Sequence, residues 1–269
     1  MRRGSLFWGT LILIAGVLLL VGNIFPGLFG NVSIWDIIWP LAIVLAGAWM
    51  LMRPAMGRRS AETQTVNEPL NGASDADIRL YHGAGRLSLR ASGAPDELLS
   101  GSCVGGVDVT NLRSGPSARL DLRSRAGQDW MDFPNFSGSN GYAWDLVVTP
   151  EVPVRLSLET GASETIMDLR ELKITDLDIK TGASSTEVTL PAQASLTRAK
   201  IASGAASVKL TVPGGVAARI RVQSGLAGIN IDSNRFPAAA GGYESPDYDS
   251  AANKVDIFVE TGVGSVEIR

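Results

Sequence analysis

The one cysteine and the one histidine of this 269-residue chain limit the chemistry that its side chains can perform. Cys103 has no partner for a disulfide within the chain, and Cys103 together with His82 cannot supply the ligands of a Cys/His zinc site. The Gly-x-Gly pairs at 83–85 and 262–264 lack the third glycine and the following helix that hold a pyrophosphate. The sequence therefore predicts no metal site and no bound cofactor.

Carboxylates are the remaining candidates for acid–base or metal chemistry. Glu151, Glu159 and Glu164 lie near one another in the sequence, but nothing in their spacing sets two carboxylates across a cleft, as glycoside hydrolysis requires. Asp247 and Asp249 lie in the run DYDSAANKVDIF, which lacks the central glycine and final glutamate of a helix-loop-helix calcium loop. We predict neither a hydrolase site nor a calcium site here.

Serine or threonine next to glycine recurs along the chain, and we interpret it as structural. A nucleophilic serine needs a positioned base, whereas regular repetition of the same dipeptide indicates a ladder of equivalent turns. Because the sequence contains no catalytic set, we predict that the protein is not an enzyme.

The charge balance argues against nucleic-acid binding. The chain has 24 Lys and Arg against 27 Asp and Glu, with a formal net charge of −3. It contains no long run of basic residues, which binding to a phosphate backbone requires. We therefore predict no nucleic-acid partner.

The carboxy-terminal part of the sequence is repetitive, and the repeats align on six turn glycines, Gly83, Gly161, Gly182, Gly204, Gly225 and Gly262. Apolar residues occupy positions −5 and −3 before each glycine and alternate with mostly polar ones, as in half-buried strands. Four repeats place apolar residues at +4 and +6, and the repeats of Gly161 and Gly182 shift them by two residues. Each glycine is expected to supply a positive φ and room for the neighbouring coil.

Repeats of about 21 residues cannot bury a core singly, but stacked repeats bury one continuous apolar column. The sequence therefore predicts an all-β domain over residues 78–269, a β-solenoid or rolled sheet of strand-turn-strand repeats. Unpaired edges of this sheet would allow a homo-oligomer.

Two insertions, residues 101–150 and 233–250, interrupt the repeats and contain many aromatic residues. The candidate surface residues are Trp130, Phe133, Phe136, Phe236, Tyr243 and Tyr248. Solenoids must cover their terminal coils, and aromatic residues are also frequent at the centres of protein interfaces. We interpret the insertions as caps, with a partner-binding surface as the alternative.

The amino-terminal part is apolar, since residues 1–57 contain only four charged residues. Residues 6–24 and 34–52 are two runs of 19 residues, close to the roughly 20 that a membrane-spanning helix needs. We predict a two-helix transmembrane hairpin over residues 1–53, in contact with the lipid bilayer. A flexible linker over residues 54–77 is predicted to join it to the all-β domain.

The arginines that flank these runs predict an orientation. Arg2 and Arg3 precede the first run, Arg53, Arg58 and Arg59 follow the second, and the loop between the runs has no cation. By the positive-inside rule both termini are expected in the cytoplasm. The predicted localisation is the cytoplasmic membrane, as a multi-pass protein.

Three stretches of the sequence resemble known bacterial families. The two apolar runs look like the LiaI/LiaF-type transmembrane region, and the TGAS turns, with DLRELKITDLDIKTGAS at 168–184, resemble the toastrack domain. The tail, residues 225–269, is similar to the end of LiaF-like cell-wall-active antibiotics response proteins.

The resemblance implies a non-enzymatic, membrane-anchored regulator of envelope stress signalling that restrains the sensor histidine kinase of a two-component system. No catalytic residue is associated with this family, so none is carried over. Toastrack-type solenoids also occur in proteins described as adhesins, so a membrane-tethered scaffold or adhesin-like protein is the alternative.

Overall fold

The strands of this protein are long and follow the repeat that the sequence predicts. The computed structural model describes residues 39–40, 43–44, 63–92, 94, 96–125 and 142–269. Within these residues thirteen strands form one sheet. Their bounds are β1 Thr63–Pro69, β2 Asp75–Ala91, β3 Glu97–Val104, β4 Val107–Ser114, β5 Ser117–Ser124, β6 Ala143–Val148, β7 Pro153–Asp168, β8 Lys173–Thr189, β9 Leu196–Thr211, β10 Ala217–Ile231, β11 Ala238–Ala239, β12 Gly242–Glu244 and β13 Lys254–Ile268.

The predicted fold class, a two-helix transmembrane hairpin followed by an all-β domain, is correct only in its second part. No helix among the described residues is long and apolar enough to span a membrane. The helical residues described in this part of the chain are Trp39, Pro40, Ile43 and Val44. The rest of both apolar runs lies outside the described residues. Hydropathy suggested the hairpin because both runs are apolar and about as long as a membrane span. Apolar composition does not by itself show which structure a run adopts.

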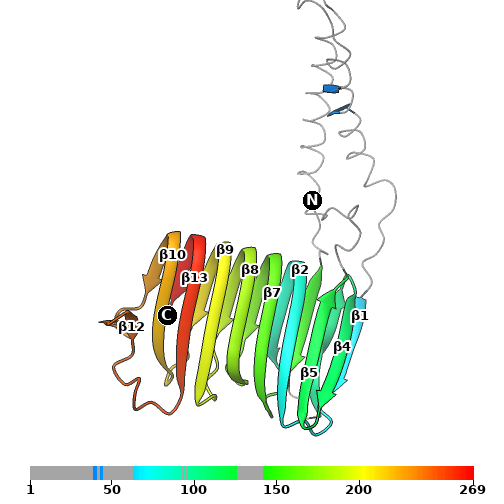
Figure 1. Ribbon diagram of the computed structural model, residues 1–269, viewed down its shortest axis with the longest axis horizontal. Coiled ribbons are helices and arrows are strands. Elements are labelled where there is room, and N and C mark those ends of the chain that lie inside the picture. Colours follow the sequence, from blue (N-terminus) through cyan, green and yellow to red (C-terminus); the bar gives the residue numbers. More distant parts are fainter. Residues whose placement is uncertain (1–38, 41–42, 45–62, 93, 95, 126–141) are drawn as a thin grey trace, which may run out of the picture. The chain divides into compact units, whose positions relative to one another are not determined.

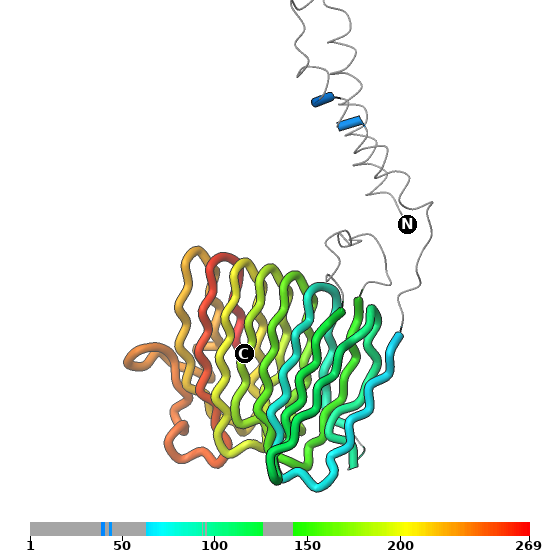
Figure 2. Tube along the Cα trace, turned by 45° about the vertical axis from the view of Figure 1, so that its right-hand side comes forward, coloured from blue at the N-terminus to red at the C-terminus, as the bar shows by residue number. Residues whose placement is uncertain are grey.

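Each of the long strands β2, β7, β8, β9, β10 and β13 carries both arms of one repeat and passes its glycine without a break. In β7 the buried side chains include Val154 and Leu158 before Gly161, and Thr165 and Met167 after it. The buried positions change from even to odd numbers at the glycine, so the strand bends there and keeps one side inward. Figures 1 and 2 show the long strands turning over at one edge, so that each contributes to two layers with the core between them.

The six aligned glycines lie at these bends, but the predicted positive φ is wrong. None of the six has a positive φ, whereas other glycines, such as Gly85, do. Glycine is needed at these bends because the neighbouring coil leaves no room for a side chain. A Cβ on Gly161 would lie 2.6 Å from the Gly83 carbonyl oxygen, and a Cβ on Gly182 would lie 2.8 Å from that of Gly161. The equivalent distances are 3.1 Å for Gly204, 2.7 Å for Gly262 and 2.7 Å for Gly225.

The strand register removes the apparent two-residue shift after Gly161 and Gly182. Leu87 of β2 pairs with Thr165, Thr165 pairs with Thr186, and Thr186 pairs with Val208. Both threonines are buried. Position +4 therefore faces the core in these coils too. The sequence pattern did not show this, because threonine counts as a polar residue.

At the amino-terminal end the two layers continue as separate strands, of which β5 and β6 are parallel to β2, while β4, β3 and β1 pair antiparallel with their neighbours. β5 and then β4 extend the layer of the first arm of β2, and β6, β3 and β1 extend the layer of its second arm. Side chains join the two extensions: Val107 N–H donates to Gln64 Oε1 at 3.1 Å, and Asn111 Nδ2 donates to Glu68 Oε2 at 2.7 Å. These contacts join the two layers at this end of the solenoid, where β1 and β4 each pair with one strand among the described residues.

The strand β1 lies within residues 54–77, for which the sequence predicts a flexible linker. In the structure β1 pairs with β3 over its whole length, and Val66 is its one buried apolar residue. The low apolar content was misleading because main-chain hydrogen bonds and polar side chains, rather than a buried face, hold this strand in place.

The last strand of the chain is not the last strand of the sheet. β13 lies between β9 and β10 and is parallel to both, as Figure 1 shows for the red strand. Stacking of the repeats in chain order, as their succession in the sequence suggests, would pair β9 directly with β10.

A row of alternating charge at the sixth position before each glycine gives a physical reason for this order. From β5 to β12 the paired residues are Arg119, Asp77, Arg155, Asp176, Arg198, Asp256, Arg219 and Glu244. Direct pairing of β9 with β10 would place Arg198 beside Arg219, and like charges on neighbouring strands destabilise a sheet. The insertion of β13 puts Asp256 between them.

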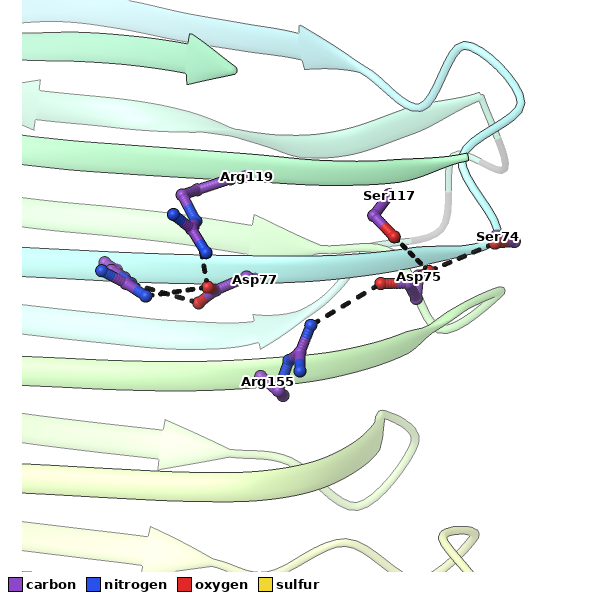
Figure 3. A network of polar contacts seen from close by, with 7 residues as sticks. Ser74, Asp75, Asp77, Ser117, Arg119 and Arg155 are labelled. Carbon is purple, nitrogen blue, oxygen red and sulfur yellow. Dashed lines mark hydrogen bonds and ion pairs between the residues drawn. The ribbon is translucent and has the colours of Figure 1, made fainter. Parts of the chain in front are cut away.

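Figure 3 shows the start of this charged row on β2. Asp77 lies 3.0 Å from Arg79 and 3.2 Å from Arg119. Asp75 accepts a hydrogen bond from Ser117 at 2.8 Å and lies 3.9 Å from Arg155. Both aspartates are therefore held by cationic or hydroxyl side chains from the strands beside them.

The distances at the glycine row predict a rank order of stability. Alanine at Gly161, Gly182 and Gly204 should lower the free energy of unfolding in that order, because the added Cβ lies progressively farther from a backbone oxygen. We expect a loss of more than about 1 kcal/mol at Gly161. Gly214 is the control, since no atom lies near its Cβ position. Urea unfolding of the full chain measures the four losses, and equal losses at Gly161 and Gly214 would contradict this account.

The alternating charge predicts that exchanging two paired charges does not restore the stability of the protein. Exchanging the register partners Arg155 and Asp176, as R155D/D176R, keeps opposite charges opposite each other but creates like-charge contacts with Asp77 and Arg198. It also removes the ion pairs of Arg155 with Asp75 and of Asp176 with Arg198. We expect the double variant and each single variant to lose similar amounts, about 0.5–1 kcal/mol at low salt. Recovery of wild-type stability in the double variant would show that the pair is isolated and that the row does not act as a unit.

Candidate functional site

The carboxy-terminal end of the solenoid is only partly covered. β12 pairs with Arg219 and Ile220 on the first arm of β10. From Arg221 onward, β10 pairs within the described residues with β13 alone. We call Arg221–Asp232 the open edge.

The open edge exposes apolar side chains whose counterparts in inner coils are buried or small. Ile229 is 43% exposed, although Val208 and Val266 in the same row are each 1% exposed. Leu226 is 82% exposed and Val263 beside it is 53% exposed, whereas β2, β7, β8 and β9 have alanine at this position. A strand edge with unpaired backbone groups and apolar side chains is a template for another strand.

A shallow polar groove of about 660 Å³ crosses β7, β8, β9 and β13 beside the glycine row. Its hydroxyl groups bond in pairs, Thr160 to Thr181 at 3.0 Å and Ser203 to Thr261 at 2.9 Å. His82, the one imidazole of the chain, is buried and does not line the groove. The groove therefore lacks an imidazole base for these hydroxyls, and the repeated hydroxyl pairs form a ladder between coils.

Among the residues that the structure describes, no three His, Cys, Asp or Glu side chains gather as a metal site would require. Cys103 is a buried free thiol, and burial raises its pKa to about 12. A thiol with so high a pKa carries almost no thiolate near neutral pH. Cys103 is therefore a core residue and not a nucleophile.

The structure brings the six predicted turn glycines into one row and buries part of the predicted aromatic surface. Phe236 and Tyr248 are 0% and 5% exposed, and Tyr243 of β12 is half-buried. Burial and a hydrogen bond donated to Asp256 raise the pKa of Tyr248 to about 12. The second insertion is therefore a cap over the first arm of β10. The other predicted surface residues, Trp130, Phe133 and Phe136, lie outside the described residues.

Sequence reasoning missed the open edge because the repeats were aligned in chain order. Two signals could have indicated it. Leu226 and Val263 replace the alanine that follows the glycine in the other repeats, and the charges at position −6 alternate only when the last repeat is placed before Arg219.

The family of the N-terminal domain of toast_rack, DUF2154, matches residues 55–211, which is more than half of the chain. This chain belongs to the toast_rack N-terminal domain family. The predicted toastrack-type domain is thereby confirmed, while the LiaF-like identity does not follow from the match. The toast_rack match ends with β9, so the open edge lies beyond it.

Solved structures resemble the toast_rack fold. One, a proposed cell adhesion protein from Clostridium sporogenes, has a TM-score of 0.69 at 18% identity and covers 77% of this chain and 98% of its own. Another, a proposed adhesin from Bacteroides fragilis, has a TM-score of 0.29 at 7% identity and covers 78% of this chain and 98% of its own. The first similarity shows a shared fold, whereas the TM-score of the second is too low to show one. No curated protein matches the chain.

A buried histidine lies beside the first bend of the toast_rack domain. His82 is 1% exposed and its ring centroid lies 4.9 Å from that of Trp144. Neither ring nitrogen of His82 has a hydrogen-bond partner in the described part of the chain, and neither has Nε1 of Trp144. Burial lowers the pKa of His82 to about 4, because a charged imidazole is poorly solvated there.

This histidine predicts a loss of stability in mild acid. Its pKa is about 6.5 in the unfolded chain and about 4 in the folded chain, so between these values the unfolded chain binds the extra proton. The stabilisation is complete above pH 6.5 and is lost as the pH falls toward 4. From pH 7.5 to pH 5, His82→Phe should lose about 2 kcal/mol less than wild type in urea unfolding. Equal losses in both proteins would place the acid sensitivity elsewhere.

Proposed function

We propose that this toast_rack protein is a non-enzymatic scaffold that binds another protein chain at the open edge of β10. The observation that carries the proposal is the combination of a strand paired on one side with the exposure of Leu226 and Ile229. Addition of a strand to such an edge supplies main-chain hydrogen bonds, and the apolar side chains add contact area.

The fold supports the same class of function. The Clostridium sporogenes structure that shares this fold is described as a proposed cell adhesion protein. At the opposite end of this solenoid, contacts between β1 and β4 join the two layers. The open edge of β10 instead exposes Leu226 and Ile229, which makes it the better place for a partner of a scaffold or adhesin-like protein.

Site-specific photo-crosslinking in living cells tests the proposal with a matched control. Ile229 on the open edge and Ile166 on β7 are 43% and 44% exposed, but β7 has a paired strand on both sides. A photoreactive residue at Ile229 should give a discrete crosslinked protein, identified by mass spectrometry, and the same residue at Ile166 should not. The adduct should disappear when Ile231→Pro removes a donor from the edge. Equal adducts at both sites would overturn the proposal.

A second candidate is a regulator of envelope stress signalling. The resemblance of the tail, residues 225–269, to the end of LiaF-like proteins favours it. In this version the partner at the open edge is a sensor histidine kinase, and the all-β domain lies in the cytoplasm. A reporter fused after Arg269 should then be active only inside the cell, and deletion of the gene should raise the output of one kinase without an inducer. A reporter active outside would exclude the regulator and favour the adhesin-like scaffold.

A further inference from the structure

We infer that the protein chain bound by the open edge is a second copy of this chain, which pairs antiparallel with the first about a two-fold axis. The inference rests on the proposed function for the claim that the edge binds a strand. Its new content is the identity and the register of the partner.

Backbone groups of β10 change sides at the bend. Before the bend, Ala218 faces the open side, because its carbonyl accepts from Ser245 N–H at 2.8 Å and its N–H donates to the Ser245 hydroxyl at 2.9 Å. After the bend, Asp232 faces β13, since its N–H donates to the Ile268 carbonyl at 3.0 Å. Backbone groups alternate between the two sides along each arm. Even positions therefore face the open side before the bend, and odd positions face it afterwards.

This alternation makes the open edge complementary to itself. Val222 and Ser224 direct their backbone groups outward on the first arm, and Ile229 and Ile231 do so on the second arm. An antiparallel copy can pair Val222 with Ile231 of the second copy, and Ser224 with Ile229 of the second copy. All four positions are on the inward side of their arms, so the apolar faces coincide as well. A one-residue slip would place inward positions opposite outward ones.

The charges select the same register. With Val222 opposite Ile231 of the second copy, Arg221 lies opposite Asp232 of the second copy, and the two-fold axis creates this pair twice. Neither side chain takes part in an ion pair within the described residues. A shift by two residues would place Arg221 opposite Asn230 or Asn234 instead. Opposite charges that face each other across strands stabilise the pairing.

The other end of the solenoid favours a closed dimer over a fibre. β1 and β4 meet there through Gln64 with Val107 and through Glu68 with Asn111. Arg113 also donates to the carbonyl oxygens of Pro69 and Leu70, at 3.1 and 2.9 Å. A head-to-tail contact would place the single strand β10 against two separate strands, β1 and β4, which these side chains hold together. Pairing of two open edges instead leaves both of the other ends free, which is the isologous arrangement of a two-fold dimer.

Disulfide crosslinking of the full chain tests the register. Gln223 and Asn230 are exposed, and they would face each other between hydrogen-bonded pairs, where Cα atoms lie about 4.5 Å apart. Two differently tagged full-length copies, Gln223→Cys and Asn230→Cys, should form a mixed disulfide dimer when oxidised together. Either copy alone should crosslink several-fold less. Cys103 remains in all samples, because it is buried.

A charge exchange in these two cysteine variants supplies the second measurement. Arg221→Glu or Asp232→Lys alone should lower the yield of mixed disulfide several-fold, and both substitutions in both copies should restore it. Thermal melts check that each variant is folded, since Asp232 also accepts from Asn234 N–H at 3.1 Å. If an exchange variant does not fold, the disulfide test in the wild-type background still decides.

The outcomes separate the inference from the proposed function. A mixed disulfide in excess over both single-copy controls supports the dimer. Equal yields, or none, overturn it. If no disulfide forms while the photo-crosslink at Ile229 captures a different protein, the proposed function stands and the second copy is the wrong partner. If both experiments fail, the open edge is not a binding site.

Discussion

The approach of successive backbones at the glycine row is the constraint on which this structure depends. Each coil bends where the Cα of one glycine faces the carbonyl oxygen of the glycine in the next coil, at a separation that leaves no room for a Cβ. Because the bend of one coil must sit on the bend of the next, all the coils share one register. Because of this shared register, equivalent positions of the repeats form rows across the sheet. Neighbouring side chains in each row must be compatible.

One of these rows decides the order of the strands and, through it, the open edge. The alternating charge at position −6 places Asp256 of β13 between two arginines. The carboxy-terminal strand is thereby paired on both sides, and β10 becomes the outermost long strand. The insertion before β13 caps only the first arm of β10. The exposed Leu226 and Ile229 follow from this arrangement, and so does the self-complementary edge.

The sequence predicted the parts of the fold that depend on local patterns. Period-2 alternation found the arms, and the spacing of glycines found the bends, since both are properties of one coil. Properties that arise from contacts between coils could not be predicted from these local patterns. The glycines were assigned a positive φ although a neighbouring backbone excludes their side chains, and Thr165 and Thr186 were not recognised as core positions. β1 was missed because its pairing with β3 depends on main-chain groups, which leave little trace in residue type.

Hydrogen exchange measured by mass spectrometry on the full chain tests the central claim most directly, because it reports which strand is outermost. We expect the amides of β13, Lys254–Ile268, to be as protected as those of β8, Lys173–Thr189. The amides of Ile229 and Ile231 should exchange faster, and their protection should rise with protein concentration. Fast exchange of β13 together with slow, concentration-independent exchange at Ile229 and Ile231 would contradict the strand order and the open edge.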